Sequence, residues 1–160
     1  MSSIVFEGNR LFWRGEGFEV EYRRPRARGV GISPAHSQNI CCVGESADKN
    51  LIVSVDCTGD ICVWNRRASA DLWRIGCLPQ AEGQKPRLIT VNDEGNMIGI
   101  AYGLRVESLM YQLAFVPAST VRLDMPPSHL RWEKDDIHHV LWATVGGAER
   151  ELHRIINQYL

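Results

Sequence analysis

The sequence predicts an all-β protein, and three observations support this fold class. Short apolar runs recur along the 160-residue chain. Glycine, asparagine, aspartate and serine, which favour tight turns, separate these runs. Corresponding strand ends fall at Phe6, Glu45, Val91 and Trp132, at intervals of 39, 46 and 41 residues. A period near 40–45 residues is typical of a repeated unit of four antiparallel strands, so about four such sheets are expected.

The clearest unit lies between Asn39 and Asn65. Its three predicted strands are continuously apolar, at residues 40–43, 51–55 and 61–64. Strands that are covered on both faces have this character, whereas half-exposed strands alternate. Turns are expected at residues 46–50 and at Thr58-Gly59, where glycine supplies a positive φ. The sequence therefore predicts a buried meander of strands here.

This unit resembles a blade of the WD-repeat β-propeller family. Ala35-His36 stands where that family has Gly-His, Ser54 lies on the second strand, and Trp64-Asn65 closes the third strand where the family has Trp-Asp. The resemblance implies a small or partial propeller of about four blades. It also implies a structural hydrogen-bond network inside the blade that includes His36, Ser54 and Trp64.

Three positions depart from the family pattern. Ala35 replaces glycine, Asn65 replaces the final aspartate, and Thr58 stands at the usual position of the turn aspartate. The third departure leaves the fourth member of the hydrogen-bond network unidentified from the sequence.

Weaker copies of the same pattern flank the clear unit on both sides. The third strand of the first copy alternates apolar and acidic residues at 18–22, which predicts one solvated face. Pro126-Pro127 ends the third copy. The expected blades lie at about residues 1–34, 35–85, 86–127 and 128–145.

The last segment, residues 146–160, has a different pattern. Gly146-Gly147 interrupts the preceding strand. Leu152, Ile155, Ile156 and Tyr159 then follow the i, i+3, i+4, i+7 spacing of one helix face, which predicts a C-terminal helix. The alternative is the third strand of the fourth copy.

Composition and charge narrow the function classes. The net charge is −1, so no global field favours nucleic acid or an anionic membrane. No apolar run is long enough to span a bilayer and the first ten residues lack a secretory core, so an intracellular protein, cytoplasmic or nuclear, is expected. The five cysteines lack a CxxC knuckle, and neither a metal site nor a cofactor is expected.

No motif for catalysis occurs. The sequence contains no Walker loop, GxSxG, HExxH or dinucleotide-binding glycine pattern. The adjacent residues His138 and His139 would point to opposite faces of a strand and so could not readily share one ion. A non-enzymatic protein is therefore expected.

The resemblance implies a scaffold for protein–protein interaction. Propellers close with four to eight blades, so about four units suggest part of a ring. Backbone groups and apolar faces of its two end sheets would then await a protein partner, another propeller segment or a second copy. Candidate partner-binding residues are Arg23, Arg24, Arg26, Arg28, Arg67, Leu152, Ile155, Ile156 and Tyr159.

Three other functions stay open. The arginines between residues 23 and 28 could bind nucleic acid, although a solvated loop that protects a sheet edge is the simpler interpretation. Arg67 is similar in position to the arginine of the WDxR motif, by which some WD-repeat proteins dock to a ubiquitin ligase. A small ring that closes on itself and binds a ligand at its centre is a further alternative.

Overall fold

The computed structural model describes residues 2–25, 31–66, 72–77 and 85–156. Every helix or strand within these ranges is a β-strand, and the strands form four antiparallel sheets in chain order. Sheet 1 contains β1 (Ser3–Glu7), β2 (Arg10–Gly15), β3 (Phe18–Pro25) and β4 (Ile32–Pro34). Sheet 2 contains β5 (Ile40–Glu45), β6 (Leu51–Asp56), β7 (Asp60–Asn65) and β8 (Leu72–Cys77).

The other two sheets differ in the number of their strands. Sheet 3 contains β9 (Leu88–Val91), β10 (Met97–Tyr102), β11 (Arg105–Tyr111) and β12 (Phe115–Arg122). Sheet 4 contains β13 (His129–Lys134), β14 (His138–Val145) and β15 (Ala148–Ile156). The all-β prediction is confirmed, and the strands form four antiparallel sheets, of which the last extends beyond residue 145.

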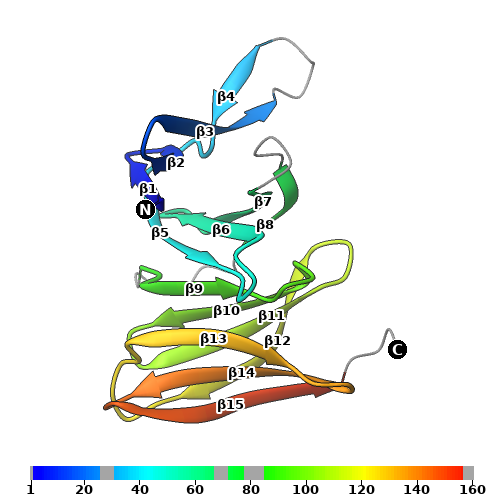
Figure 1. The fold of residues 1–160 in the computed structure, drawn as a ribbon. Coiled ribbons are helices and arrows are strands. Elements are labelled where there is room, and N and C mark those ends of the chain that lie inside the picture. Colours follow the sequence, from blue (N-terminus) through cyan, green and yellow to red (C-terminus); the bar gives the residue numbers. More distant parts are fainter. Residues whose placement is uncertain (1, 26–30, 67–71, 78–84, 157–160) are drawn as a thin grey trace.

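The sheets stand face to face in chain order, from sheet 1 at one end to sheet 4 at the other (Figure 1). Their first strands are neighbours, since β1 contacts β5, β5 contacts β9, and β9 contacts β13. Sheets 1 and 4 lie at opposite ends of the array. The part of the chain that the structure describes therefore forms an open array, not a self-closed ring.

Three apolar layers hold neighbouring sheets together. The two faces of sheet 2 show how alternation directs side chains: Ile52 and Trp64 pack toward sheet 1, whereas Val53 and Val63 pack toward sheet 3. All six residues of β6 and all six of β10 are buried. Burial of one such aliphatic side chain contributes about 1.5–3 kcal/mol, which explains the continuously apolar sequences of these strands.

The turn between the first two strands has the same form in sheets 2 and 3. The amide of Ser46 donates to the carbonyl of Leu51, and the Ser46 hydroxyl accepts from the Leu51 amide at 3.0 Å. In sheet 3 the Asn92 amide donates to the Met97 carbonyl, and the Asn92 side-chain oxygen accepts from the Met97 amide at 3.0 Å. The repeated spacing in the sequence thus corresponds to a repeated local structure.

The C-terminal helix expected over residues 148–160 is wrong for the residues that the structure describes, because Ala148–Ile156 forms β15. Gly146 and Gly147 have φ values of 58° and 82°, so they make a tight hairpin turn that returns the chain along β14. A β-bulge opposite Leu141 and Trp142 places both Leu152 and Ile155 against the apolar layer of sheet 4. The bulge therefore produces the three-residue spacing that resembles a helix face.

The outer face of sheet 1 is covered by charged side chains. Phe12 is 2% exposed, and the guanidinium carbons of Arg10 and Arg14 lie 4.8 and 4.5 Å from its ring centre. Arg10 pairs with Glu21 at 2.7 Å, and Arg14 pairs with Glu19 at 2.6 Å. The expectation of a bare apolar face at this end is therefore wrong.

The outer face of sheet 4 is built in the same way. Arg131 lies 5.3 Å from the ring centre of Trp142 and pairs with Glu149 at 2.6 Å and with Glu133 at 3.0 Å. On β15, Arg154 also forms an ion pair with Glu151. Both end faces thus carry paired charges over a single aromatic ring, an arrangement that suits contact with water or with a polar partner.

The backbones of sheets 2 and 3 approach each other closely at Gly44. A Cβ atom at this position would lie 1.9 Å from the carbonyl oxygen of Ile89, which is backbone and cannot rotate away. By contrast, a Cβ atom at Gly15 would meet the ring of Phe18, a side chain that is 42% exposed. Only glycine allows β5 and β9 to pack at this separation.

We expect Gly44→Ala to destabilise the protein by about 1–3 kcal/mol, because β5 and β9 must move apart. Urea unfolding followed by tryptophan fluorescence measures the effect. Gly15→Ala is the matched control and should cost less, since the Phe18 ring can move. Equal stability of Gly44→Ala and the unchanged protein would contradict the described contact between the sheets.

Candidate functional site

A chain of hydrogen bonds runs through the interior of sheet 2. The indole Nε1 of Trp64 donates to the Ser54 hydroxyl at 3.0 Å, and Ser54 Oγ lies 2.7 Å from His36 Nε2. His36 Nδ1 lies 3.1 Å from Oδ2 of Asp56. The structure thus brings together the three residues that the resemblance implied, and Asp56 is the fourth member of the chain.

Asp56 occupies the role left open in the sequence. It is the last residue of β6 and is fully buried. Its second oxygen, Oδ1, accepts from the Thr58 amide at 2.9 Å, from the Thr58 hydroxyl at 2.6 Å and from the Asp60 amide at 3.1 Å. One carboxylate therefore orders the β6–β7 turn and orients His36. The sequence signal that could have identified Asp56 is its position at the end of an apolar strand, two residues before Thr58.

The hydrogen-bond partners define the protonation state of His36. A carboxylate only accepts, so Nδ1 carries the proton and Nε2 accepts from the Ser54 hydroxyl. Burial lowers the pKa of His36 below its ordinary value of 6.5, although Asp56 acts in the opposite direction. The neutral imidazole is therefore the stable form inside the sheet.

A second group of polar side chains adjoins this chain at its Asp56 end. Oδ2 of Asp60 lies 3.3 Å from His36 Nδ1 and accepts from Nη2 of Arg24 at 2.7 Å. The same Arg24 nitrogen contacts the Cys62 sulfur. The side chains of Arg24 and Asp60 are 27% and 28% exposed, so this group connects the buried network with solvent.

The basic segment is engaged within the protein wherever the structure describes its side chains. Arg23 pairs with Glu21 at 3.0 Å, and Arg24 is held by Asp60. Arg26 and Arg28 lie outside the described residues, as do Arg67 and Tyr159. Because Arg23 and Arg24 already have carboxylate partners, neither is a free cation for phosphate.

The remaining candidate residues lie on β15. Leu152 and Ile155 are partly buried against the apolar layer between sheets 3 and 4. Ile156 is 65% exposed at the end of the strand. Of these three residues, Ile156 is the most exposed, and Leu152 and Ile155 keep only part of their surface free.

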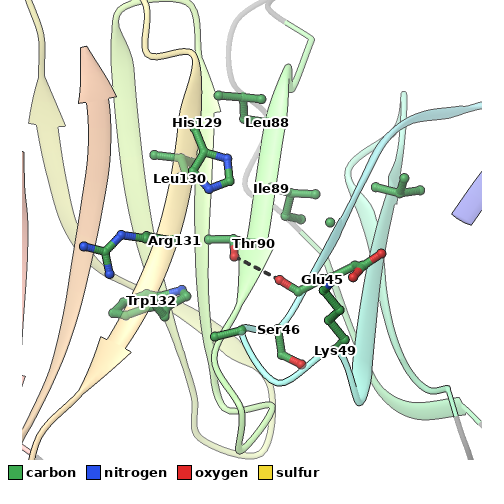
Figure 2. Close-up of a pocket in the computed structure, with 13 residues that line it drawn as sticks. Glu45, Ser46, Lys49, Leu88, Ile89, Thr90, His129, Leu130, Arg131 and Trp132 are labelled. Atoms are coloured by element: carbon green, nitrogen blue, oxygen red, sulfur yellow. Dashed lines mark hydrogen bonds between the residues drawn. The ribbon is translucent and has the colours of Figure 1, made fainter. Parts of the chain in front are cut away.

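A groove of about 400 Å³ lies between the first strands of sheets 2, 3 and 4 (Figure 2). Leu88, Ile89 and Leu130 give it apolar walls, while Lys49 and His129 supply polar groups. Across the groove wall, the Thr90 hydroxyl donates to the Glu45 carbonyl at 3.3 Å. The Ser46 hydroxyl is engaged in hydrogen bonds of its own turn, with Asp48 and Leu51, and makes none to a histidine among the described residues. The groove therefore offers surface for binding and lacks a paired nucleophile and base among its described residues.

No family model matches the chain, and no curated protein is similar to it. In the described ranges, no helix is long and apolar enough to cross a membrane.

Removal of Asp56 should be costly, because Asp56→Ala leaves His36 Nδ1 and two turn amides without their buried acceptor. We expect a loss of about 3 kcal/mol in the free energy of unfolding. Chemical denaturation tests this. Asp124→Ala, whose carboxylate is 73% exposed, is the control and should change stability little. A similar small effect for both variants would show that the network contributes nothing.

Stability should also depend on pH through His36. Its pKa is lowered in the folded state, so the unfolded chain binds the proton more readily. This contribution is fully present above pH 6.5, the ordinary value, and is lost as the pH falls toward the folded pKa. Urea midpoints between pH 8 and pH 5 measure it. A midpoint that rises as the pH falls below 6.5 would contradict the buried neutral imidazole.

Proposed function

We propose that this protein is a non-enzymatic interaction module, a partial WD-like propeller that is completed by, or docked into, a protein partner in a larger assembly. Sheets that follow one another at a regular spacing, together with a tryptophan–serine–histidine–aspartate chain inside one of them, support this proposal. An intracellular location is part of the proposal, and the free cysteines Cys41, Cys42, Cys57 and Cys62 favour it.

The observation that carries the proposal is the free edge of β15. The third strands of sheets 1, 2 and 3 are paired on both sides, by β2 and β4, by β6 and β8, and by β10 and β12. In the described residues, β15 pairs only with β14. The outward-pointing backbone groups of this nine-residue strand are therefore available to a fourth strand, and addition of a strand is a common way for a sheet to bind a partner.

The side chains of β15 define the partner that suits this edge. Leu152 and Ile155 lie toward the apolar layer and are only partly buried, so a partner strand with apolar residues on that side would cover them further. Glu151 and Arg154 are paired with each other on the strand. The partner would thus gain affinity from backbone pairing and apolar contact more than from charge.

A charge placed at the exposed end of the edge should weaken association. Ile156 is 65% exposed, so Ile156→Lys should preserve the fold while it disfavours a strand beside β15. We expect unmodified protein to exceed its monomer mass of 18.1 kDa with rising concentration in light scattering, and the variant to do so less. Leu113→Lys is the control, because Leu113 is 98% exposed in the turn between β11 and β12.

The proposal fails if the protein is a monomer at every concentration and its thermal unfolding is cooperative throughout. Equal association of the Ile156→Lys and Leu113→Lys variants would show that the contact lies away from β15.

A further inference from the structure

Three possible metal ligands meet where the hydrogen-bond chain of sheet 2 reaches solvent, and the Asp56 carboxylate lies beside one of them. His36 Nδ1, a carboxylate oxygen of Asp60 and the Cys62 sulfur all lie within 4.8 Å of one another. Oδ2 of Asp56 lies 3.1 Å from the same histidine nitrogen. These donors come from two places, the connection between β4 and β5 and the hairpin of β6 and β7. Their separation in the sequence explains why no motif predicted them.

Two of the distances between the donors are close to those expected for tetrahedral coordination. Zinc binds nitrogen, oxygen and sulfur at roughly 2.0–2.3 Å, which places neighbouring ligand atoms about 3.3–3.7 Å apart. Here Nδ1 of His36 lies 3.3 Å from Asp60 Oδ2, and that oxygen lies 3.9 Å from the Cys62 sulfur. Small adjustments of these side chains would therefore enclose a metal ion. Imidazole, carboxylate and thiolate together form a donor set that zinc prefers.

Arg24 holds the position that the ion would take. Its Nη2 atom donates to Asp60 at 2.7 Å and contacts the Cys62 sulfur. Its Nε atom, however, is buried without a hydrogen-bond partner among the described residues. A buried donor without a partner costs free energy, so the guanidinium is not fully stabilised there. Because the Arg24 side chain is 27% exposed, it can turn outward and open a path from solvent.

We propose that His36, Asp56, Asp60 and Cys62 bind one zinc ion, in competition with Arg24. The ion would tie the connection between sheets 1 and 2 to the β6–β7 hairpin and release the Arg24 guanidinium to solvent. Three anionic ligands, the zinc ion and the nearby arginine together balance in charge.

Binding releases one proton to solvent and moves a second proton within His36. Burial raises the pKa of the Cys62 thiol to about 12, so the group is protonated before the metal enters. On coordination the thiol loses its proton to solvent and the sulfur becomes a zinc-bound thiolate, with no change in oxidation state. His36 keeps one ring proton, which moves from Nδ1 to Nε2 when Nδ1 binds the metal. Ser54 Oγ, which lies 2.7 Å from Nε2, can then accept a hydrogen bond from Nε2–H.

This site is independent of the proposed partner edge, because β15 belongs to sheet 4 and the four donors border sheet 2. Failure of one proposal therefore leaves the other intact.

Cobalt provides the test, since Co²⁺ substitutes for Zn²⁺ and is visible by absorption. We expect one equivalent of Co²⁺ to give tetrahedral visible bands and a thiolate charge-transfer band, and Zn²⁺ to remove both at about micromolar concentration. Cys62→Ser should abolish the charge-transfer band, whereas Cys57→Ser, at an exposed cysteine outside the cluster, should retain it. Asp60→Asn should weaken binding at least about tenfold.

Arg24→Gln supplies a test that does not depend on removal of a ligand. Loss of the competing cation should tighten zinc binding, and the thermal midpoint of this variant should rise more with Zn²⁺ than that of the unmodified protein. The proposal is overturned if the unmodified protein gives no charge-transfer band, if the band persists in Cys62→Ser, or if Arg24→Gln binds zinc no more tightly.

Discussion

The structure depends on the burial of sheet 2 between two other sheets. A sheet in this position must present apolar side chains on both faces, and Ile52, Val53, Val63 and Trp64 do so. The polar groups in the same layer must then bond to one another. The chain from Trp64 to Asp56 satisfies this requirement, because each member donates to or accepts from the next at 2.7–3.1 Å. Apolar packing and internal polar pairing are thus parts of one constraint.

The same constraint explains the ends of the array. Sheets 1 and 4 each have one neighbour, and their outer faces carry arginine–glutamate pairs above Phe12 and Trp142. Such faces can remain in water. The free edge of β15 is different, because its backbone groups face outward with no strand beside them in the described part of the chain. The backbone groups without partners therefore lie along the edge of β15, whereas the two end faces are covered by paired charged side chains.

Much of the fold could be predicted from the sequence because strand and turn signals are local. The apolar runs at β5, β6 and β7 and the glycine turns between strands were sufficient to predict these strands and their order. The error at β15 has a specific cause, since a bulge placed Leu152 and Ile155 on one face with the spacing of a helix. Local periodicity cannot distinguish these cases without knowledge of the pairing with β14.

The polar site was less predictable, because its members are distant in the sequence. His36, Ser54 and Trp64 were expected through the resemblance, whereas Asp56 was missed because a different residue occupied the expected turn position. The contact of Arg24 with Asp60 and Cys62 joins β3 to β7 across two sheets. No pattern of spacing indicates which arginine of a basic segment will make such a contact.

Amide hydrogen exchange, resolved by residue, tests the central claim most directly. The claim is that, among the described residues, β15 pairs only with β14, while the third strands of the other sheets are paired on both sides. Amides along β7 and β11 should exchange slowly throughout, whereas β15 should show fast exchange at the amides that point away from β14. Uniform slow exchange along β15 in a dilute monomer would contradict the account, because it would require a strand on the free edge.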